Sequence, residues 1–544
     1  MGIRLGVPFW EEDDRIISWA AFFAIPTSEV GSPTLLPLGV SVRFDLTGRD
    51  WEDWKATGWY SRGKYYESTE EFSNAVFSQG FEKPQPNVDG NWTSTDKQGD
   101  ALPLDDLPPP VSVSQGVQRY RLDAQEDYVS WMDFSFYLAT SRDIGLSLFD
   151  IQYKGKRLLY ELSLQEAVTL YAGSEPFASQ ATFFDTVDGL GATLVPLIQG
   201  YDCPSYATYL NATFSEGNTT NTVAGAICIF EHDAGFPIRR HSVPLSYTSV
   251  AKNIVFTVRT ISTVGNYDFM IEYHFFYDGA IEVSVRASGY ISAAYWDGNS
   301  DYGFHIHDYL SGSLHDHVLT FKADLDVMGT KNSVQKIEFV PETTEYPWSQ
   351  GIAHETFKTS RSFLSNESSV NWAENDNIIY AFVNQDTPNR FGEYPGYRMK
   401  RSAGTIHFTN GKATNVGKAA ASATHDFHIT KQKDTEPRAA DSYNQFAPQD
   451  PIVDFSKFLD GESVEQEDVV VWFNLGMHHM PHTGDLPNTM FTAAHSAMRF
   501  EPFNYLYGDP SVATNQQVRV DYSEDGSVEA VEEFGKMQAN GTCG

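Results

Sequence analysis

The sequence has 544 residues, which is long enough for one large domain and a second, smaller one. Its 38 Lys and Arg against 72 Asp and Glu give a formal net charge of −34, which argues against a nucleic-acid partner. The same charge would attract a cationic ligand, or it serves only to keep the protein soluble. The longest apolar run near the start, residues 16–25, is too short to cross a bilayer, so no membrane span is expected.

Residues 1–110 are predicted to form a small α+β domain. Ser68 followed by Glu71 is a capping box, in which the serine accepts bonds from first-turn amides and the glutamate reaches back, so a helix should begin there. Residues 83–110 are rich in Pro, Gly, Asp and Asn and end in L-P-P-P, which sustains neither a helix nor a central strand. We therefore expect a domain boundary there, with a second domain at residues 111–544.

The second domain is predicted to be mainly β, a large antiparallel β-sandwich. Short alternating or apolar runs, such as residues 254–263, 270–277 and 281–285, are separated by turns. Asp278 and Gly279 lie between two of these runs, and Asp-Gly is favoured in hairpin turns whose residues need positive φ. Tyr267 should therefore begin a hairpin strand or immediately precede it.

Histidine pairs suggest a metal site. H-x-H occurs at His305/His307 and at His315/His317, and on a strand such a pair points to one side. Only the second pair continues into V-L-T-F-K-A-D-L-D at residues 318–326, where the histidines would face inward and the aspartates outward. A third histidine from the pair at residues 478 and 479 would complete a copper site, although zinc remains chemically possible. From spacing alone, the alternative interpretation is that each pair consists of polar residues at a strand end.

The segment T-x-x-N-Y-D at residues 263–268, the H-x-H at 315–317 and G-M-H-H-M-P-H-T-G-D-L-P-N-T at 476–489 together resemble the copper amine oxidases. The resemblance covers nearly the whole chain, but a further amino-terminal domain of the family is absent. It implies oxidation of primary amines by O2 to aldehyde, ammonia and hydrogen peroxide, in a homodimer. Copper(II) would be bound by His315, His317 and His479, with His478 as a neighbour. Tyr267 would be the precursor of topaquinone.

The same resemblance assigns roles around the quinone. Counted back from G-Y-D-C-P at residues 200–204, the family's catalytic base aligns with Asp185. Tyr171 would orient the quinone ring, and Asn266 would restrain the bound substrate. Without the resemblance, Asp185 reads as a turn residue before Asp188 and Gly189, and Asp188 is the competing base if the alignment is shifted.

Further family sites follow by alignment. A calcium-like ion would be bound by Asp324, Leu325, Asp326, Asp468 and Val469. A second such site would use Glu436, Phe458 and Asp460, where Asp460 replaces the usual Asn. Cys203 and Cys228 flank a polar loop at residues 211–222 and could join its base, and the resemblance supports a disulfide between them. Cys543 is either free or intermolecular.

Five N-x-[ST] sequons hint at a secreted or extracellular protein, although no signal peptide is recognised. Their asparagines are Asn91, Asn211, Asn218, Asn366 and Asn540. Two functions of other classes stay open. One is a metal-binding or adhesive β-sandwich that never forms the quinone. The other is a zinc hydrolase that uses the three histidines with Asp185 as its base.

Overall fold

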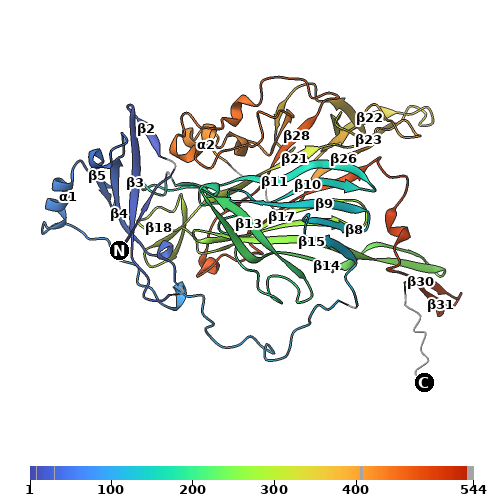
Figure 1. The fold of residues 1–544 in the computed structure, drawn as a ribbon, viewed down its shortest axis with the longest axis horizontal. Coiled ribbons are helices and arrows are strands. Elements are labelled where there is room, and N and C mark those ends of the chain that lie inside the picture. Colours follow the sequence, from blue (N-terminus) through green and yellow to red (C-terminus); the bar gives the residue numbers. More distant parts are fainter. Residues whose placement is uncertain (8, 30, 115, 180, 405–408, 536–544) are drawn as a thin grey trace.

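Strands dominate the protein, whose computed structural model describes residues 1–7, 9–29, 31–114, 116–179, 181–404 and 409–535 (Figure 1). Cys543 and Asn540 lie outside these residues. The expected state of the cysteine and the use of the last sequon therefore remain predictions. The strands form antiparallel sheets of six, ten, twelve and three strands. In the described part of the chain, no helix is both long enough and apolar enough to cross a membrane.

The amino-terminal region forms the six-stranded sheet and carries the helix α1. Its strands are β1 (Gly2–Leu5), β2 (Trp10–Glu12), β3 (Arg15–Phe23), β4 (Pro37–Asp45), β5 (Lys55–Ser61) and β6 (Lys64–Tyr66). Helix α1 (Thr69–Val76) begins after Ser68, whose side chain accepts the N–H of Glu71, as predicted. The carboxylate of Glu71 accepts the N–H of Glu67, one residue before the expected partner. The boundary near residue 110 stays a prediction.

Two large sheets pack face to face as a β-sandwich, which confirms the predicted fold class. The first sheet contains β7 (Tyr120–Asp123), β8 (Tyr128–Trp131), β9 (Phe134–Ser141), β10 (Gly145–Tyr153), β11 (Lys156–Tyr171), β12 (Thr182–Phe184), β21 (His315–Leu325), β24 (Ser368–Val370), β27 (Phe427–Lys431) and β28 (Val469–His479).

The second sheet contains β13 (Thr208–Glu216), β14 (Thr219–Val243), β15 (Tyr247–Val264), β16 (Tyr267–Phe276), β17 (Ile281–Gly289), β22 (Ser333–Glu345), β23 (Ala353–Phe363), β25 (Ile378–Val383), β26 (Gly396–Ala403), β29 (His495–Phe503), β30 (Gln517–Tyr522) and β31 (Val528–Glu533). The small sheet contains β18 (Ala294–Tyr295), β19 (Gly303–His307) and β20 (Leu310–Ser313), and a second helix, α2, spans Thr414–Ala419.

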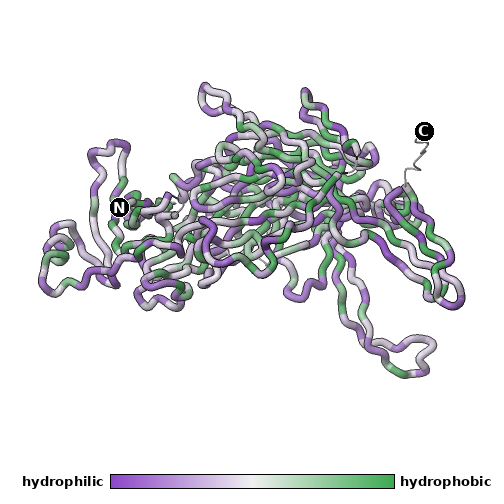
Figure 2. Tube along the Cα trace, turned by 90° about the horizontal axis from the view of Figure 1, so that it is seen from below, coloured by the Kyte–Doolittle hydropathy of each residue, from purple (hydrophilic) through white to green (hydrophobic). Residues whose placement is uncertain are grey.

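The hydrophobic core lies between the two large sheets. Phe136 on β9 stacks on Phe275 on β16, with ring centroids 4.5 Å apart, and both rings are completely buried. Figure 2 shows hydrophobic and hydrophilic residues interspersed along the chain, as expected when alternate side chains of strands face the core and the solvent. Burial between the sheets therefore fixes which face of each strand points inward.

The predicted hairpin after β16 is present, and its turn differs in type. Gly279 has a φ of 86°, whereas Asp278 is outside the positive-φ region. The N–H of Phe276 bonds the carbonyl of Ala280, so three residues form the loop instead of two. β16 begins at Tyr267, which confirms the predicted position of that tyrosine.

The disulfide Cys203–Cys228 is present, as predicted. The polar segment 211–222 is not an irregular loop, because it forms the hairpin of β13 and β14. The disulfide thus joins the residues preceding β13 to the second strand of its own hairpin.

Replacing both Cys203 and Cys228 with Ala should lower the free energy of unfolding by roughly 3 kcal/mol, because the 25-residue separation constrains the unfolded chain. Thermal unfolding followed by circular dichroism measures the loss. A reductant should lower the midpoint of the unaltered protein toward that of the variant and leave the variant unchanged. Equal sensitivity of both proteins to the reductant would contradict the assignment.

Candidate metal centre and active site

Three histidine side chains meet on the inner face of the first large sheet. His315 and His317 are alternate residues of β21 and point to the same side, and His479 on β28 pairs directly with His315. The ring centroid of His315 lies 4.9 Å from that of His317 and 4.8 Å from that of His479. All three side chains are buried. The structure therefore brings the three predicted copper ligands together.

Hydrogen bonds from the protein hold the two histidines of β21 in place. The Nδ1 of His317 is 3.0 Å from the Oγ1 of Thr169, and its Nε2 is buried without a hydrogen-bond partner. The Nδ1 of His315 donates to the carbonyl of Ser313 at 2.9 Å. Burial, with the imidazole of His479 adding to it, lowers the pKa of His317 to about 3. These neutral rings keep a lone pair for a metal, and the unpartnered Nε2 fits a copper ligand.

His479 is oriented by a carboxylate. Its Nε2 lies 3.3 Å from the Oδ2 of Asp485, and its Nδ1 lies 3.2 Å from the Nε2 of His315. A carboxylate on the outer nitrogen of a histidine is the common arrangement around a metal-binding imidazole. His478 pairs with Asp316 on the other face of the sheet and is exposed, so the geometry favours His479 as the ligand.

Tyr267 approaches this centre from the opposite sheet. It is the first residue of β16, its ring is buried, and its centroid lies 5.4 Å from that of His317. Its hydroxyl is 3.1 Å from the Oγ1 of Thr489, and burial raises the pKa of the phenol. A buried, neutral phenol is therefore held beside the neutral imidazole of His317.

Tyr171 and Asn266 also lie at this centre. Tyr171 ends β11, and its ring stacks on that of His315 with centroids 4.6 Å apart. Burial, followed by the nearby Tyr267, raises the pKa of the Tyr171 hydroxyl. The side-chain amide of Asn266 donates to the carbonyl of Tyr290, which holds the turn that precedes Tyr267.

Asp185 begins a short 3-10 helix (Asp185–Val187) and is buried. Burial, followed by the negative charges of Glu166 and Asp188, raises the pKa of Asp185 well above its usual value, and Arg4 opposes this shift. Asp188 follows this helix as its C-cap residue and is exposed. Asp185 is thus a turn residue and also the desolvated carboxyl of the pair, so it suits the role of base better than Asp188.

Glu166 is a neighbour of Asp185 that the sequence analysis missed. One carboxylate oxygen accepts the N–H of Thr186 at 3.1 Å, and the other accepts its hydroxyl. Burial raises the pKa of Glu166 to about 7. A single acidic residue among the mostly apolar residues 162–170 was the available signal, because such a group is buried only with partners.

Residues 122–521 match the family model described as "Copper amine oxidase, enzyme domain", and residues 32–100 match a domain of unknown function. The chain belongs to the copper amine oxidase family. It is 56% identical over 524 residues to copper amine oxidase vicK1 of Bipolaris victoriae, covering 96% of this chain and 74% of that protein. It is 31% identical over 530 residues to the liver isozyme of primary amine oxidase from Bos taurus, covering 94% and 67%.

Solved structures of similar proteins support the same family assignment. The amine oxidase of Aspergillus nidulans has a TM-score of 0.95 and 49% identity, with 100% of this chain and 73% of that chain covered. The lysyl oxidase of Pichia pastoris has a TM-score of 0.93 and 36% identity, with coverages of 99% and 74%. The predicted family and amine oxidase activity are thereby confirmed, and membership implies copper and topaquinone as cofactors.

The other H-x-H pair of this copper amine oxidase lies elsewhere. His305 and His307 belong to β19, where His305 stacks on Trp296 and His307 stacks on Trp92 at centroid distances of 4.4 and 3.8 Å. These two imidazoles pack against indole rings in the small sheet. For this pair, the interpretation as ordinary polar residues of a strand fits the structure.

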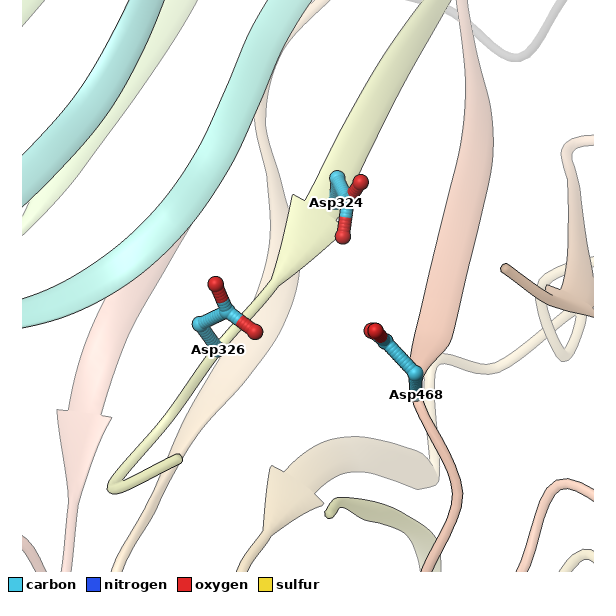
Figure 3. Close-up of side chains that lie close together, drawn as sticks. All are labelled: Asp324, Asp326 and Asp468. Carbon is cyan, nitrogen blue, oxygen red and sulfur yellow. The ribbon is translucent and has the colours of Figure 1, made fainter. Parts of the chain in front are cut away.

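The first predicted calcium-like site is partly assembled (Figure 3). Carboxylate oxygens of Asp324, Asp326 and Asp468 lie within 4.8 Å of one another. Leu325 pairs with Val469 between them, as the register of β21 and β28 requires. The aspartates do lie on the face opposite the copper ligands, but the expectation that they face outward is wrong. Asp324 is only 3% exposed, because residues of the 414–470 segment cover this face of the sheet.

The second predicted site differs from the expectation. The carboxylates of Glu436 and Asp460 lie close together, and both form ion pairs with the ammonium group of Lys433. Glu367 and Glu462, which the sequence analysis did not name, complete the cluster. The spacing of Asp460 and Glu462, two residues apart beside Phe458, was the available signal for Glu462.

Gly289 pairs with Tyr267 across β16 and β17 and has a φ of 150°. A Cβ there would lie 2.8 Å from the Cα of Tyr267, so Gly289→Ala should displace the tyrosine and reduce quinone formation at least tenfold at equal copper content. Phenylhydrazine adduct per chain measures the quinone. Gly298→Ala, at a φ of 80° with open space around it, carries the backbone strain alone and should keep full quinone. Equal yields in both variants would contradict this prediction.

Proposed function

We propose that this chain converts primary amines and O2 into aldehydes, ammonia and hydrogen peroxide, with copper bound by His315, His317 and His479 and a quinone derived from Tyr267. The observation that carries the proposal is the buried phenol of Tyr267, 5.4 Å from the imidazole of His317. A β-sandwich that only bound a metal would not require a tyrosine buried against the metal ligands.

The quinone at position 267 would supply an electrophilic carbonyl for the amine, and copper held by His315, His317 and His479 would supply redox chemistry with O2. The surrounding side chains orient the ring at position 267 and accept a proton from the substrate. Tyr171 stacks on His315 and limits the movement of the ring at position 267. Asp185 removes the proton from the carbon next to the amine nitrogen, and its raised pKa lets it retain that proton until it is returned.

The small domain contributes to the environment of this base. The guanidinium of Arg4, on β1, lies 5.0 Å from the ring centroid of Phe183 and 3.4 Å from the Oγ of Ser292. Its positive charge lowers the pKa of Asp185, against burial and Glu166. Arg4 therefore favours the ionised aspartate, which is the form that accepts a proton.

We also propose that the cluster of Asp324, Asp326 and Asp468 binds a calcium ion. Asp468 has a buried carboxylate oxygen without a hydrogen-bond partner, and burial raises the pKa of Asp324 to about 7. Three clustered carboxylates with little positive charge beside them are the ligand set that a hard cation prefers. Calcium content after metal removal and reloading tests this site.

A homodimer is the proposed assembly. The hairpin of β22 and β23 lies at one edge of the sandwich (Figure 1), and β23 is mostly exposed. Trp348, Ile352 and Phe357 in and beside this hairpin are 67%, 65% and 75% exposed. Apolar side chains of this kind are typical of an interface with another chain. A solution mass of one chain by light scattering would reject the dimer.

Secretion is proposed on two grounds. The disulfide Cys203–Cys228 forms readily only in an oxidising compartment. The asparagines of four sequons, Asn91, Asn211, Asn218 and Asn366, are exposed. Absence of any mass shift on glycosidase treatment, together with recovery of the protein inside the cells that make it, would reject this proposal.

Tyr267→Phe should bind copper as the unaltered protein does, form no phenylhydrazine adduct, and lose amine-dependent O2 uptake by at least a thousandfold. The reason is that phenylalanine lacks the oxygen from which the quinone forms, while the three imidazoles are untouched. Phe269→Tyr, which adds a hydroxyl to a neighbouring ring of the same core, is the matched control and should keep the adduct. A Tyr267→Phe variant that turns over without O2 would instead support the zinc hydrolase.

Glu166→Gln should move the acid limb of the pH–rate profile to lower pH. Asp185 must be ionised to accept a proton, its pKa is raised, and Glu166 is the largest cause of that shift after burial. Removing this negative charge lowers the pKa of Asp185, so the ionised form persists at lower pH. Asp188→Asn, which removes an exposed and weaker neighbour, should produce a smaller shift in the same direction. An unchanged acid limb in Glu166→Gln would show that another group governs it.

A further inference from the structure

Arg4 on β1 brings a positive charge from the amino-terminal sheet to the side of the active site. Its side chain lies on the less exposed face of the strand, whereas Ile3 and Leu5 on the other face are exposed. The guanidinium carbon lies 5.0 Å from the ring centroid of Phe183, and Nη1 lies 3.4 Å from the Oγ of Ser292. Arg4 therefore contacts two segments that are distant from it in the sequence.

Phe183 connects Arg4 to the copper centre. Its ring meets the ring of Tyr171 edge-on, with centroids 5.8 Å apart, and Tyr171 stacks in turn on His315. Burial, followed by Tyr267, raises the pKa of the Tyr171 hydroxyl, and the positive charge of Arg4 opposes that shift. The charge of Arg4 thus reaches the ring that lies beside the proposed quinone.

The guanidinium of Arg4 has no carboxylate partner. Among the residues that the structure describes, none of the aspartates and glutamates lies within ion-pair distance of it, and its one hydrogen bond is the long one to Ser292. Burial lowers the pKa of Arg4, and acidic groups that include Asp188 and Asp185 oppose this shift from further away. Asp185 cannot be a permanent partner, because it must accept a proton from the substrate. A largely buried arginine with unused N–H donors is a ready site for an anion.

The order of burial places Arg4 on the solvent side of the base. Arg4 and Phe183 are partly exposed, whereas Asp185, Tyr171 and Tyr267 are buried. The base has to face the carbon next to the amine nitrogen. The part of a substrate that extends from this carbon toward solvent on the side of Asp185 therefore approaches the guanidinium.

We propose that Arg4 selects substrates by the charge at the end remote from the reacting amine, so that primary amines with a carboxylate there are favoured and diamines are disfavoured. A carboxylate can accept two N–H groups of a guanidinium at once, whereas the second ammonium of a diamine would lose water beside a like charge. The formal net charge of −34 attracts every ammonium group alike, so this discrimination has to be local. The inference rests on the proposed function and names its substrate class.

Amine-dependent O2 uptake tests the proposal with three series of substrates that have chains of three to six carbons: alkylamines, diamines, and amino acids whose amine and carboxylate are at opposite ends. Each kcat/KM is divided by that of the alkylamine of equal length, which cancels the common effect of Arg4 on Asp185. We expect the best amino acid to exceed its matched diamine by roughly tenfold, the worth of one charge-assisted hydrogen bond.

Variants of Arg4 assign this preference to its charge. Arg4→Met should lower the ratio of amino acid to diamine by roughly tenfold, Arg4→Glu should invert it, and Arg4→Lys should keep its direction. Arg43→Met is the matched control and should keep the full ratio. Arg43 lies in the same sheet but contacts Glu12 and Thr57, away from Phe183.

Binding without turnover provides a second measurement. Isothermal titration of the copper-loaded Tyr267→Phe variant with 6-aminohexanoate should give a Kd that rises by roughly tenfold when Arg4→Met is added. This measurement needs no quinone. If no amine is oxidised at all, the proposed function fails, and a Kd that depends on Arg4 still supports the anion site.

Two results would overturn the proposal. One is an unaltered protein that oxidises diamines as well as the matched amino acids at every chain length. The other is a folded Arg4→Met variant that keeps both the ratio and the Kd. If Arg4→Met does not fold, Arg4→Glu replaces it, and a ratio that still favours the amino acid in that variant would contradict the role of Arg4. If neither variant folds, the preference of the unaltered protein decides.

Discussion

The pairing register of β21 with β28 is the constraint on which the rest of the site depends. It sets His315 opposite His479, with His317 two residues along on the same face. A shift of one residue would turn the β21 histidines to the opposite face and bring Asp316 inward. The core prevents such a shift, because Leu319 and Phe321 follow on the same side and are buried between the sheets.

Burial of the reactive groups is the second theme. Desolvation lowers the pKa of His315 and His317 and raises the pKa of Tyr267 and of Asp185, so burial pushes each of these groups toward its uncharged form. Neutral imidazoles are the form that binds copper, and a neutral phenol is tolerated in a core. Folding therefore leaves His315 and His317 in the form that offers a lone pair to a metal.

The two acidic clusters show two solutions to one problem. Both join segments far apart in the sequence through carboxylates, which repel one another unless a cation lies between them. Among the described residues no lysine or arginine lies within ion-pair distance of Asp324 or Asp468, whereas the ammonium group of Lys433 lies between Asp460 and Glu462. The two acidic clusters thus connect the outer face of the first sheet to the segment that covers it, one through carboxylates alone and the other through carboxylates and a lysine.

The sequence by itself determined the local features and the identity of the family. The cap of α1 by Ser68, the strand that begins at Tyr267 and the inward side of His315 and His317 follow from spacing within a few residues. Such features depend on backbone geometry that neighbouring residues set. Only the tertiary structure distinguished Asp185 from Asp188, brought Glu166 beside the base, and buried the aspartates of β21. Lys433 occupies the second cluster for the same reason, since burial and charge pairing between distant segments arise only when the chain has packed.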